Sequence, residues 1–300
     1  MQARIMTLLA ETPVHAGSGS DLGAVDLPIQ RERHTELPVI RSSGLKGALR
    51  DASTRREQDK GRTVLLFGSE PGDEPLKQGE LIFTDARLLL FPVRTVGPVF
   101  AWVTSPYCLA RLERDLAELD APFSPLRSAA AAAARLKVGQ DQAFVASAEA
   151  FGGQRIVLEE FEVDAAPKSE LANLATALRS FIGGGAALDF WREHLGKGLV
   201  LVHEDLLRDF CRHATEVVTR VRLDPKTKTV ETGALWTEEY LPADSLLYAM
   251  VAQTARAEGK PNEAWDHLKK VVGTPLQVGG NETIGRGLVR ARIVEPPQGA

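Results

Sequence analysis

The sequence has little cysteine, no long hydrophobic run and no excess of positive charge. Its two cysteines, Cys108 and Cys211, lie far apart in unrelated contexts, so they imply neither a zinc site nor a disulfide framework. No stretch approaches the roughly 20 apolar residues of a membrane-spanning helix, and the N-terminal segment lacks the apolar core and cleavage site of a signal peptide. These absences predict a protein of the reducing cytoplasm that has no contact with a membrane.

The charge balance argues against a protein that binds nucleic acid alone and without specificity, because such a protein is usually basic. Here 36 Lys and Arg residues face 40 Asp and Glu residues, for a net charge of −4. The distribution is uneven, however, since residues 31–62 carry nine basic and five acidic residues. This basic strip fits a subunit that meets RNA on one side and protein neighbours on the others, and it fits an ordinary solvated face equally well.

Residues 15–50 combine a glycine-rich turn, an isolated acid at Asp26 and the start of a helix. The turn (HAGSG) lacks the G-K-[ST] ending of a P-loop, so ATP binding is not predicted. Backbone amides in such turns and at helix N-termini can bind phosphate. Ser42 or Ser43 is the expected N-cap, and a phosphate there would offset the repulsion between Lys46 and the helix dipole. The stretch predicts a backbone-lined path for a polyanion, with one carboxylate beside it.

Hydrophobic patterning divides the rest of the chain into strands and helices. Short apolar or alternating runs predict strands over residues 3–11, 81–90, 99–104, 156–161, 200–202, 217–223, 229–236 and 288–294. Helical periodicity predicts helices after residue 42 and over 107–119, 169–181, 205–212, 244–258 and 263–271. The alanine tract at 129–134 favours a helical insertion over disorder.

This order predicts an α+β fold: a ferredoxin-like, RNA-recognition-type sheet with helices on one face. We expect a single domain over residues 1–300, with a helical insertion at 107–215 and a projecting β-hairpin at 217–236. The tip of that hairpin is polar and carries Lys226 and Lys228. Such sheets often bind single-stranded RNA, but this one lacks the aromatic RNA-recognition consensus, so stacking of bases on the sheet is not predicted.

Seven short strings occur in an order that is typical of one family. They read HAGSG, VDLPIQRER, SSGLKGALR, FTDARLLLFPVR, VFAWVTSP, GALWTEEYLP and GGNETIGRG. With them the chain resembles the RAMP superfamily of CRISPR systems and, within it, the backbone subunit of the Cmr-type (type III-B) effector, its fourth component. The resemblance runs almost from end to end, although the alanine tract matches nothing distinctive.

The resemblance implies a subunit that acts inside a multisubunit complex. Several copies would stack along a guide crRNA as a helical filament, in contact with other Cmr-type subunits. The 217–236 hairpin would act as a thumb that separates guide from target at regular intervals. The subunit would also cleave the paired target RNA, as an endoribonuclease that uses a divalent metal, Mg²⁺ or Mn²⁺.

The same resemblance assigns the site. Asp26 matches the family's key acidic residue for cleavage, and it would recruit the metal through water. The positions associated with the same site are His15, Glu238, Glu239 and Tyr240. The residues expected to contact RNA are Gly17, Ser18, Gly19, Arg41, Ser42, Ser43, Lys46, Arg50, Lys226, Lys228, Gly280, Asn281 and Arg286.

Each assignment has a structural alternative. An isolated Asp26 would more often be a loop residue that caps its own backbone. His15 could make only a structural hydrogen bond, and Glu239 and Tyr240 could simply end the hairpin. Two other functions also stay open for the whole chain. One is a guide-binding backbone with an inert Asp26; the other is an endonuclease that acts alone and without metal on precursor guide RNA, through His15 as general base.

Overall fold

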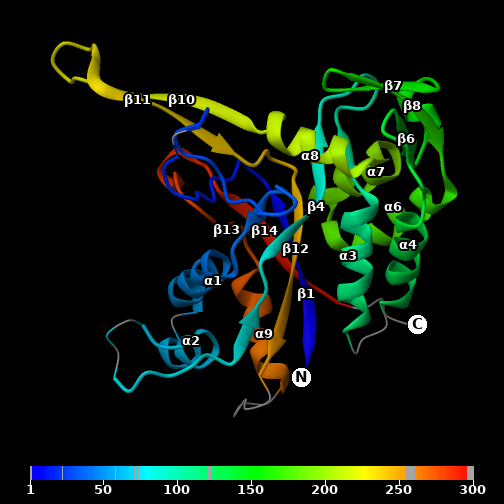
Figure 1. The fold of residues 1–300 in the computed structure, drawn as a ribbon. Helices are drawn as coiled ribbons and strands as arrows, with labels where there is room; N and C mark the ends of the chain where they lie inside the picture. Colours follow the sequence, from blue (N-terminus) through cyan, green and yellow to red (C-terminus); the bar gives the residue numbers. More distant parts are fainter. Residues whose placement is uncertain are drawn as a thin grey trace.

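The computed structural model describes residues 2–21, 23–57, 59–70, 72, 74–119, 123–254 and 261–295. Within them the chain forms a twelve-stranded mixed sheet, helices that pack on it, and a separate two-stranded hairpin (Figure 1). The α+β class predicted from the sequence is confirmed. None of the helices in these residues is both long enough and apolar enough to cross a bilayer.

Four antiparallel neighbours form the centre of the sheet, in the order β14-β1-β12-β4. In that order they span Leu288–Val294, Ala3–Ala10, Leu246–Gln253 and Ala86–Val93. Along the chain, α1 (Ser42–Glu57) follows β1, and α9 (Pro261–Val271) connects β12 to β14. Three short strands pair with β4, β12 and β14 in turn: β2 (Val39–Ile40), β3 (Leu81–Phe83) and β13 (Leu276–Gln277).

The sheet continues beyond β4 in the order β5-β9-β6-β8-β7, with β5–β9 and β6–β8 parallel. These strands span Ala101–Thr104, Leu199–Val202, Gln142–Val145, Phe161–Pro167 and Arg155–Leu158. The same part of the chain supplies α3 to α8, which span Pro106–Ala117, Ser124–Ala134, Ala148–Phe151, Ser169–Ile182, Asp189–Gly198 and Glu204–His213. The alanine tract lies in α4, so its prediction as helix is confirmed.

Helices cover both faces of the sheet, so the expectation that they lie on one face is wrong. One core contains residues of α1, α8, α9 and α2 (Lys60–Phe67), and the other contains residues of α3, α4, α6 and α7. The reason is visible in β1, where Met6 and Leu8 belong to the first core while Ile5 and Leu9 belong to the second. A strand that is apolar on both sides requires cover on both.

The helix predicted over residues 244–258 is also wrong. Leu246–Gln253 forms β12, which pairs with β1 at the centre of the sheet, and residues 255–258 lie outside the described part. The run LLYAMV is apolar at every position because this strand is buried on both faces. Such a run has neither a strand period nor a helix period, so periodicity alone cannot assign it. The helices predicted near residues 107, 169, 205 and 263 are confirmed.

The separate hairpin consists of β10 (Glu216–Leu223) and β11 (Val230–Tyr240), and it extends away from the sheet (Figure 1, yellow). Its outer part is exposed, including the apolar side chains of Val221 and Leu235. β11 continues past the predicted end at residue 236, and its last residues, 238–240, are buried. One strand therefore connects the exposed hairpin rigidly to the body of the protein.

An ion pair holds the loop that precedes β2 against α3. The Glu32 carboxylate accepts hydrogen bonds from Arg111 Nη1 at 2.7 and 2.8 Å, and both side chains are buried. Burial lowers the pKa of Arg111, but the hydrogen bonds and the charge of Glu32 outweigh it, so the net pKa lies above its ordinary value. Arg111 Nε and Nη2 have no other partner among the described residues. Glu32 therefore accepts the hydrogen bonds that this buried guanidinium donates within the described residues.

Replacing Glu32 with Ala should destabilise the protein strongly, because Arg111 would remain buried without its partner. Breaking a buried pair in this way costs about 3–5 kcal/mol of the free energy of unfolding, which urea denaturation measures. The matched control is Glu36→Ala in the same loop, since Glu36 pairs with Arg212 where both side chains are exposed and such a pair contributes little. Two variants of equal stability would contradict this role of Glu32.

Candidate functional site

The N-terminal loop, residues 15–31, is held between the base of the hairpin and the glycine-rich loop at 279–287 (Figure 1). On the hairpin side, the Leu27 amide donates to the Thr237 carbonyl and the Glu239 amide donates to the Leu27 carbonyl, both at 3.0 Å. On the other side, the Gly280 amide donates to the His15 carbonyl at 3.0 Å. Three segments that are distant in sequence thus meet, and they bring most of the predicted site residues together.

Asp26 lies on the exposed side of this loop and is fixed to β11 by Thr237. Its Oδ2 accepts hydrogen bonds from the Thr237 amide at 2.7 Å and from the Thr237 hydroxyl at 2.9 Å. The same hydroxyl accepts a hydrogen bond from the Asp26 amide at 3.0 Å. The Thr237 amide and hydroxyl hold the pKa of the Asp26 carboxyl below its usual range. The carboxylate is therefore ionised and oriented, and its Oδ1 receives no hydrogen bond from another described residue.

His15 is half-buried and is anchored to the same strand. Its Nδ1 lies 2.7 Å from the Glu239 carbonyl oxygen, and because a carbonyl can only accept, Nδ1 carries a proton. Its Nε2 faces Gly17, where an added Cβ would approach to 2.8 Å. Asp26 thus bonds to Thr237, and His15 bonds to Glu239. The backbone groups of these two strand residues point to the same edge of β11, so Asp26 and His15 are held along one edge of the strand.

Glu239 is buried, and its carboxylate holds the loop in place. Oε2 accepts a hydrogen bond from the Ile29 amide at 3.0 Å. Oε1 accepts from the Arg31 guanidinium and, at 2.7 Å, from the Thr215 hydroxyl. With an exposed fraction of 5%, this carboxylate organises the surrounding backbone and has no free face toward RNA.

Glu238 and Tyr240 form a buried network with the C-terminal loop. The Glu238 carboxylate accepts hydrogen bonds from the Trp236 indole at 2.8 Å, from the Asn281 amide group at 2.9 Å and from the Tyr240 hydroxyl. The Arg286 guanidinium lies over the Tyr240 ring, 4.9 Å from its centroid. Burial and the Glu238 carboxylate raise the pKa of Tyr240 to about 12. The phenol therefore stays protonated at neutral pH and serves the network as a donor.

The N-terminus of α1 is capped by a side chain from another part of the chain. The helix begins at Ser42, so both predicted N-cap serines, Ser42 and Ser43, lie within it. Asp85 Oδ1 accepts a hydrogen bond from the Ser42 amide at 2.7 Å, and Oδ2 accepts from Arg41 Nη1 at 3.0 Å. Burial raises the pKa of Asp85, but these two donors outweigh it, so the pKa lies below its ordinary value. The carboxylate thus already occupies the first anion position of this helix.

Lys46 and Arg50 lie one turn apart on α1 and differ in their surroundings. Arg50 donates to the Ser69 carbonyl at 3.3 Å and lies 3.4 Å from the Glu70 carboxylate. Lys46 has no anionic partner among the described residues, and partial burial together with the charge of Arg50 lowers its pKa. Lys46 is therefore the cation that would gain more from a phosphate.

Lys226 and Lys228 lie at the exposed tip of the hairpin, apart from the other predicted residues (Figure 1). Asp224 Oδ1 accepts hydrogen bonds from the amides of Lys226 at 2.7 Å and Thr227 at 2.9 Å, and these bonds close the turn. Both lysines can therefore contact only a ligand that lies at the outer end of the hairpin.

Asp26 is the side chain through which a divalent metal fits this arrangement. Among the described residues, no three His, Cys, Asp or Glu side chains form a group that could hold a metal ion. Mg²⁺ keeps several of its waters and is commonly held by one or two carboxylates together with phosphate oxygens. The exposed, ionised carboxylate of Asp26 fits that mode, in which water and phosphate oxygens would supply the remaining ligands.

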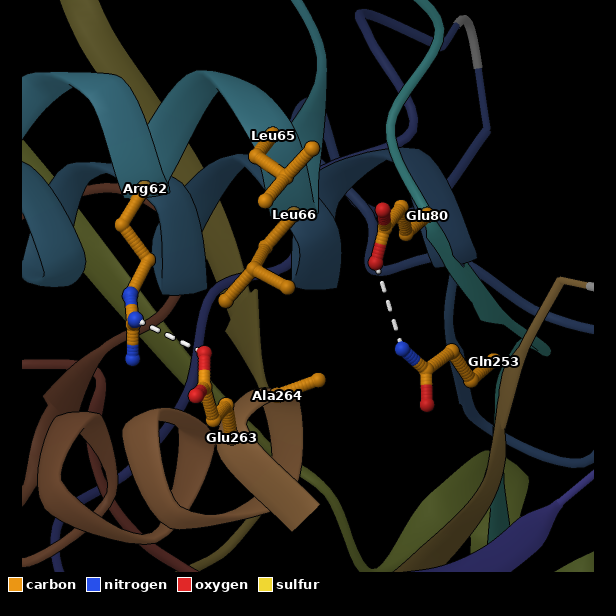
Figure 2. A pocket seen from close by; sticks show the side chains of 7 residues that line it. All are labelled: Arg62, Leu65, Leu66, Glu80, Gln253, Glu263 and Ala264. Carbon is orange, nitrogen blue, oxygen red and sulfur yellow. Dashed lines mark hydrogen bonds and ion pairs between the residues drawn. The ribbon is translucent and has the colours of Figure 1, made fainter. Parts of the chain in front are cut away.

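A separate hollow lies between α2, α9 and β12, and it contains none of the predicted site residues (Figure 2). Its lining consists of Arg62, Leu65, Leu66, Glu80, Gln253, Glu263 and Ala264. Arg62 pairs with Glu263 at 3.1 Å, and Gln253 donates to Glu80 at 3.2 Å. Its polar side chains thus bond to one another and join the surrounding elements.

Three residues that shape the site were not predicted from the sequence. Thr237 binds Asp26, while Arg31 and Thr215 bind Glu239. Thr237 stands directly before the predicted pair of glutamates in the GALWTEEYLP string, and this adjacency is the one signal that could have identified it. Nothing local distinguishes Thr215, and Arg31 reads as one more member of the basic strip.

Comparisons with known proteins identify the family of this chain. A family model described as the RAMP superfamily matches residues 7–290. The chain is 37% identical to the CRISPR system Cmr endoribonuclease Cmr4 of Pyrococcus furiosus, over 98% of this chain and 97% of that protein. It is 27% identical to the CRISPR system CMR subunit Cmr4 of Saccharolobus solfataricus, over 94% of each.

A solved structure extends the similarity to the fold. The crystal structure of oligomeric Cmr4 from Pyrococcus furiosus superposes with a TM-score of 0.73 and 28% identity, over 99% of this chain and 100% of that one. A chain of the type III-B Cmr-beta complex bound to cognate target RNA gives a TM-score of 0.79 over 98% of each chain. At 24% identity, the latter shows a shared fold alone.

Docking of the two glycine-rich loops should be sensitive to a single methyl group at Gly279. This residue has a φ of +80°, and an added Cβ would lie 2.2 Å from the His15 carbonyl oxygen. We expect Gly279→Ala to lower the free energy of unfolding by about 2–5 kcal/mol, from the left-handed conformation and the overlap together. The control is Gly280→Ala, whose Cβ would lie in ordinary contact, 3.7 Å from His15 Cδ2. Equal urea midpoints for the two variants would contradict the docking described here.

Proposed function

Since this chain belongs to the RAMP superfamily, we propose that it is the backbone subunit of a type III-B (Cmr-type) CRISPR effector. Copies of it stack along a guide crRNA, in contact with other subunits of the effector, and cleave the target RNA that pairs with the guide. The similarity to a Cmr endoribonuclease along nearly the whole chain supports this function. The oligomeric state named for the relative of known structure supports the stacking.

The single observation that carries the cleavage role is the state of Asp26. It is the site carboxylate that combines exposure, ionisation and a fixed orientation, whereas Glu238 and Glu239 are buried among protein donors. We therefore assign cleavage to Asp26. Glu238, Glu239 and Tyr240 act through hydrogen bonds that hold β11, the N-terminal loop and the C-terminal loop together.

The chemistry requires little more than orientation. The 2′-oxygen of a target nucleotide attacks the adjacent phosphorus and expels the 5′-oxygen of the next nucleotide, provided that the 2′-oxygen, the phosphorus and the 5′-oxygen are held in line. The products are a 2′,3′-cyclic phosphate and a 5′-hydroxyl, with water taking the proton of the 2′-hydroxyl and supplying one to the leaving oxygen. A divalent metal, Mg²⁺ or Mn²⁺, would offset the charge on the phosphate oxygens when Asp26 holds it through water. His15 contributes by closing the loop beside Asp26, since its Nδ1–H bonds to the strand and its Nε2 faces Gly17.

The central strands and the hairpin have matching roles in this proposal. Counted along the chain, the order β14-β1-β12-β4 is 4-1-3-2, with α1 and α9 as the two connecting helices, and this arrangement supports a ferredoxin-like unit. The β10–β11 hairpin is the thumb that separates guide from target. Its exposed apolar side chains and its position beyond the body support that role. Lys226 and Lys228 at its tip would meet RNA phosphates.

Guide binding is assigned to the N-terminal half of α1 and the two glycine-rich loops. Among the predicted cations of these segments, Arg41, Arg50 and Arg286 have ion pairs and Lys46 has none within the described residues, so Lys46 is the first candidate for a guide phosphate. Arg41, Arg50 and Arg286 already contact protein groups. They would have to share or exchange these contacts on binding RNA.

Two other functions predict different results. If the chain is a guide-binding backbone with an inert Asp26, it would still assemble with the effector, but another subunit would cleave the target RNA. An endonuclease for precursor guide RNA would act alone and without metal through His15.

Asp26→Ala, assembled with guide and the other effector subunits, should slow cleavage strongly without weakening target binding. A group that acts in the transition state contributes about 10²- to 10⁴-fold in rate, and we expect a loss in that range in single-turnover cleavage of labelled target. Asp21→Ala, in the same loop, is the control and should cleave at the unmodified rate. Persistent cleavage by the Asp26 variant would reject the assignment and favour the inert backbone.

Lys46→Ala should weaken guide binding and flatten its dependence on salt. Each phosphate contact to a single strand contributes about 0.7 to the slope of log K against log salt concentration. Filter binding of guide RNA at several salt concentrations measures this slope. Lys197→Ala is the control, because Lys197 is exposed on α7 over the other face of the sheet. An unchanged slope for the Lys46 variant would exclude a phosphate contact there.

A further inference from the structure

Within the described residues, the hydrogen bonds that the Asp26 carboxylate accepts from other residues all come from Thr237. Its amide and its hydroxyl both donate to Asp26 Oδ2, at 2.7 and 2.9 Å, and its hydroxyl oxygen accepts from the Asp26 amide at 3.0 Å. One threonine side chain thus fixes both the carboxylate and the backbone of the same residue.

We propose that Thr237 is a positioning residue for target cleavage, and that its hydroxyl sets the orientation of the Asp26 carboxylate. This inference rests on the proposed function and assigns Thr237 no contact with RNA. The backbone amide alone can hold Oδ2 but leaves the carboxylate free to turn about that single bond. The hydroxyl supplies the second point that stops this rotation, so Oδ1 keeps one direction.

The location of Thr237 gives this contact a second consequence. Thr237 lies on β11 between the exposed hairpin and the buried end of the strand, and it pairs with Thr219 of β10. The adjacent loop residue, Leu27, exchanges backbone bonds with the same strand. Asp26 is therefore fixed relative to the hairpin itself. When the hairpin enters the guide–target duplex, the Asp26 carboxylate therefore lies at a fixed position relative to the hairpin. This fixed position would determine which target phosphate is cleaved.

The test compares Thr237→Val with Thr237→Ser in the assembled effector. Valine keeps the shape and the backbone amide but removes the hydroxyl, whereas serine keeps the hydroxyl. We expect Thr237→Val to slow single-turnover cleavage by about 10- to 100-fold, the effect of a small displacement at a reacting centre. Target affinity and the melting temperature of the complex should not change, and Thr237→Ser should restore most of the rate.

Two controls make the outcome decisive. Thr219→Val makes the same chemical change on the paired strand, at a residue with no hydrogen bond to Asp26 among the described contacts, and should slow cleavage much less than Thr237→Val does. In the Asp26→Ala background, Thr237→Val should cause no further loss, because the two residues act as one unit.

The outcomes separate this inference from the proposed function. Cleavage at the unmodified rate by Thr237→Val, with the expected large loss in Asp26→Ala, would overturn the inference alone. Cleavage at the unmodified rate by Asp26→Ala would overturn both. Equal slowing by the Thr237 and Thr219 valine variants, or slowing that follows lost target affinity, would assign the effect to the hairpin as a whole and would also reject a positioning role.

Discussion

The site depends on the backbone pairing between the N-terminal loop and the last residues of β11. Leu27 bonds to Thr237 and Glu239, and this contact places a loop without regular structure on a strand whose end is buried. Asp26 gains its orientation from that contact, and the hairpin gains a fixed relation to the body. A loop on its own would sample many conformations, so the strand provides the order that a reacting carboxylate needs.

Buried carboxylates explain why so many residues near this strand can matter without touching RNA. Glu238 and Glu239 are each 5% exposed, and each is surrounded by donors from other segments. A buried carboxylate is tolerated only when its hydrogen bonds are complete. Removing Glu239 would leave Arg31 and the Ile29 amide without their acceptor, and Asp26 would move with the loop. If Asp26 has the proposed role, loss of activity at these positions would report displacement of the loop, whereas loss at Asp26 would report loss of the reacting group.

Much of this could be predicted from the sequence, and the failures have physical causes. The α+β class, the hairpin and most helices followed from local periodicity. β12 did not, because a strand buried on both faces has no period, and the second covered face of the sheet was missed for the same reason. The resemblance placed Asp26 and the glutamates, but it could not give their environments. Thr237 lies 211 residues from Asp26 in the chain, and Asp85 caps α1 from a separate strand connection. Such contacts are set by tertiary structure, which local patterns do not encode.

The proposed function requires that Asp26 faces the target strand from a fixed place beside the hairpin. The most direct measurement is a structure of the assembled effector with guide and a target that carries 2′-deoxy nucleotides and so cannot be cleaved. The account predicts the Asp26 carboxylate next to a target phosphate at the base of each hairpin, still bonded to Thr237, with Lys46 on the guide. An Asp26 carboxylate that points to solvent or to the guide, with another subunit's group at the target phosphate, would contradict it.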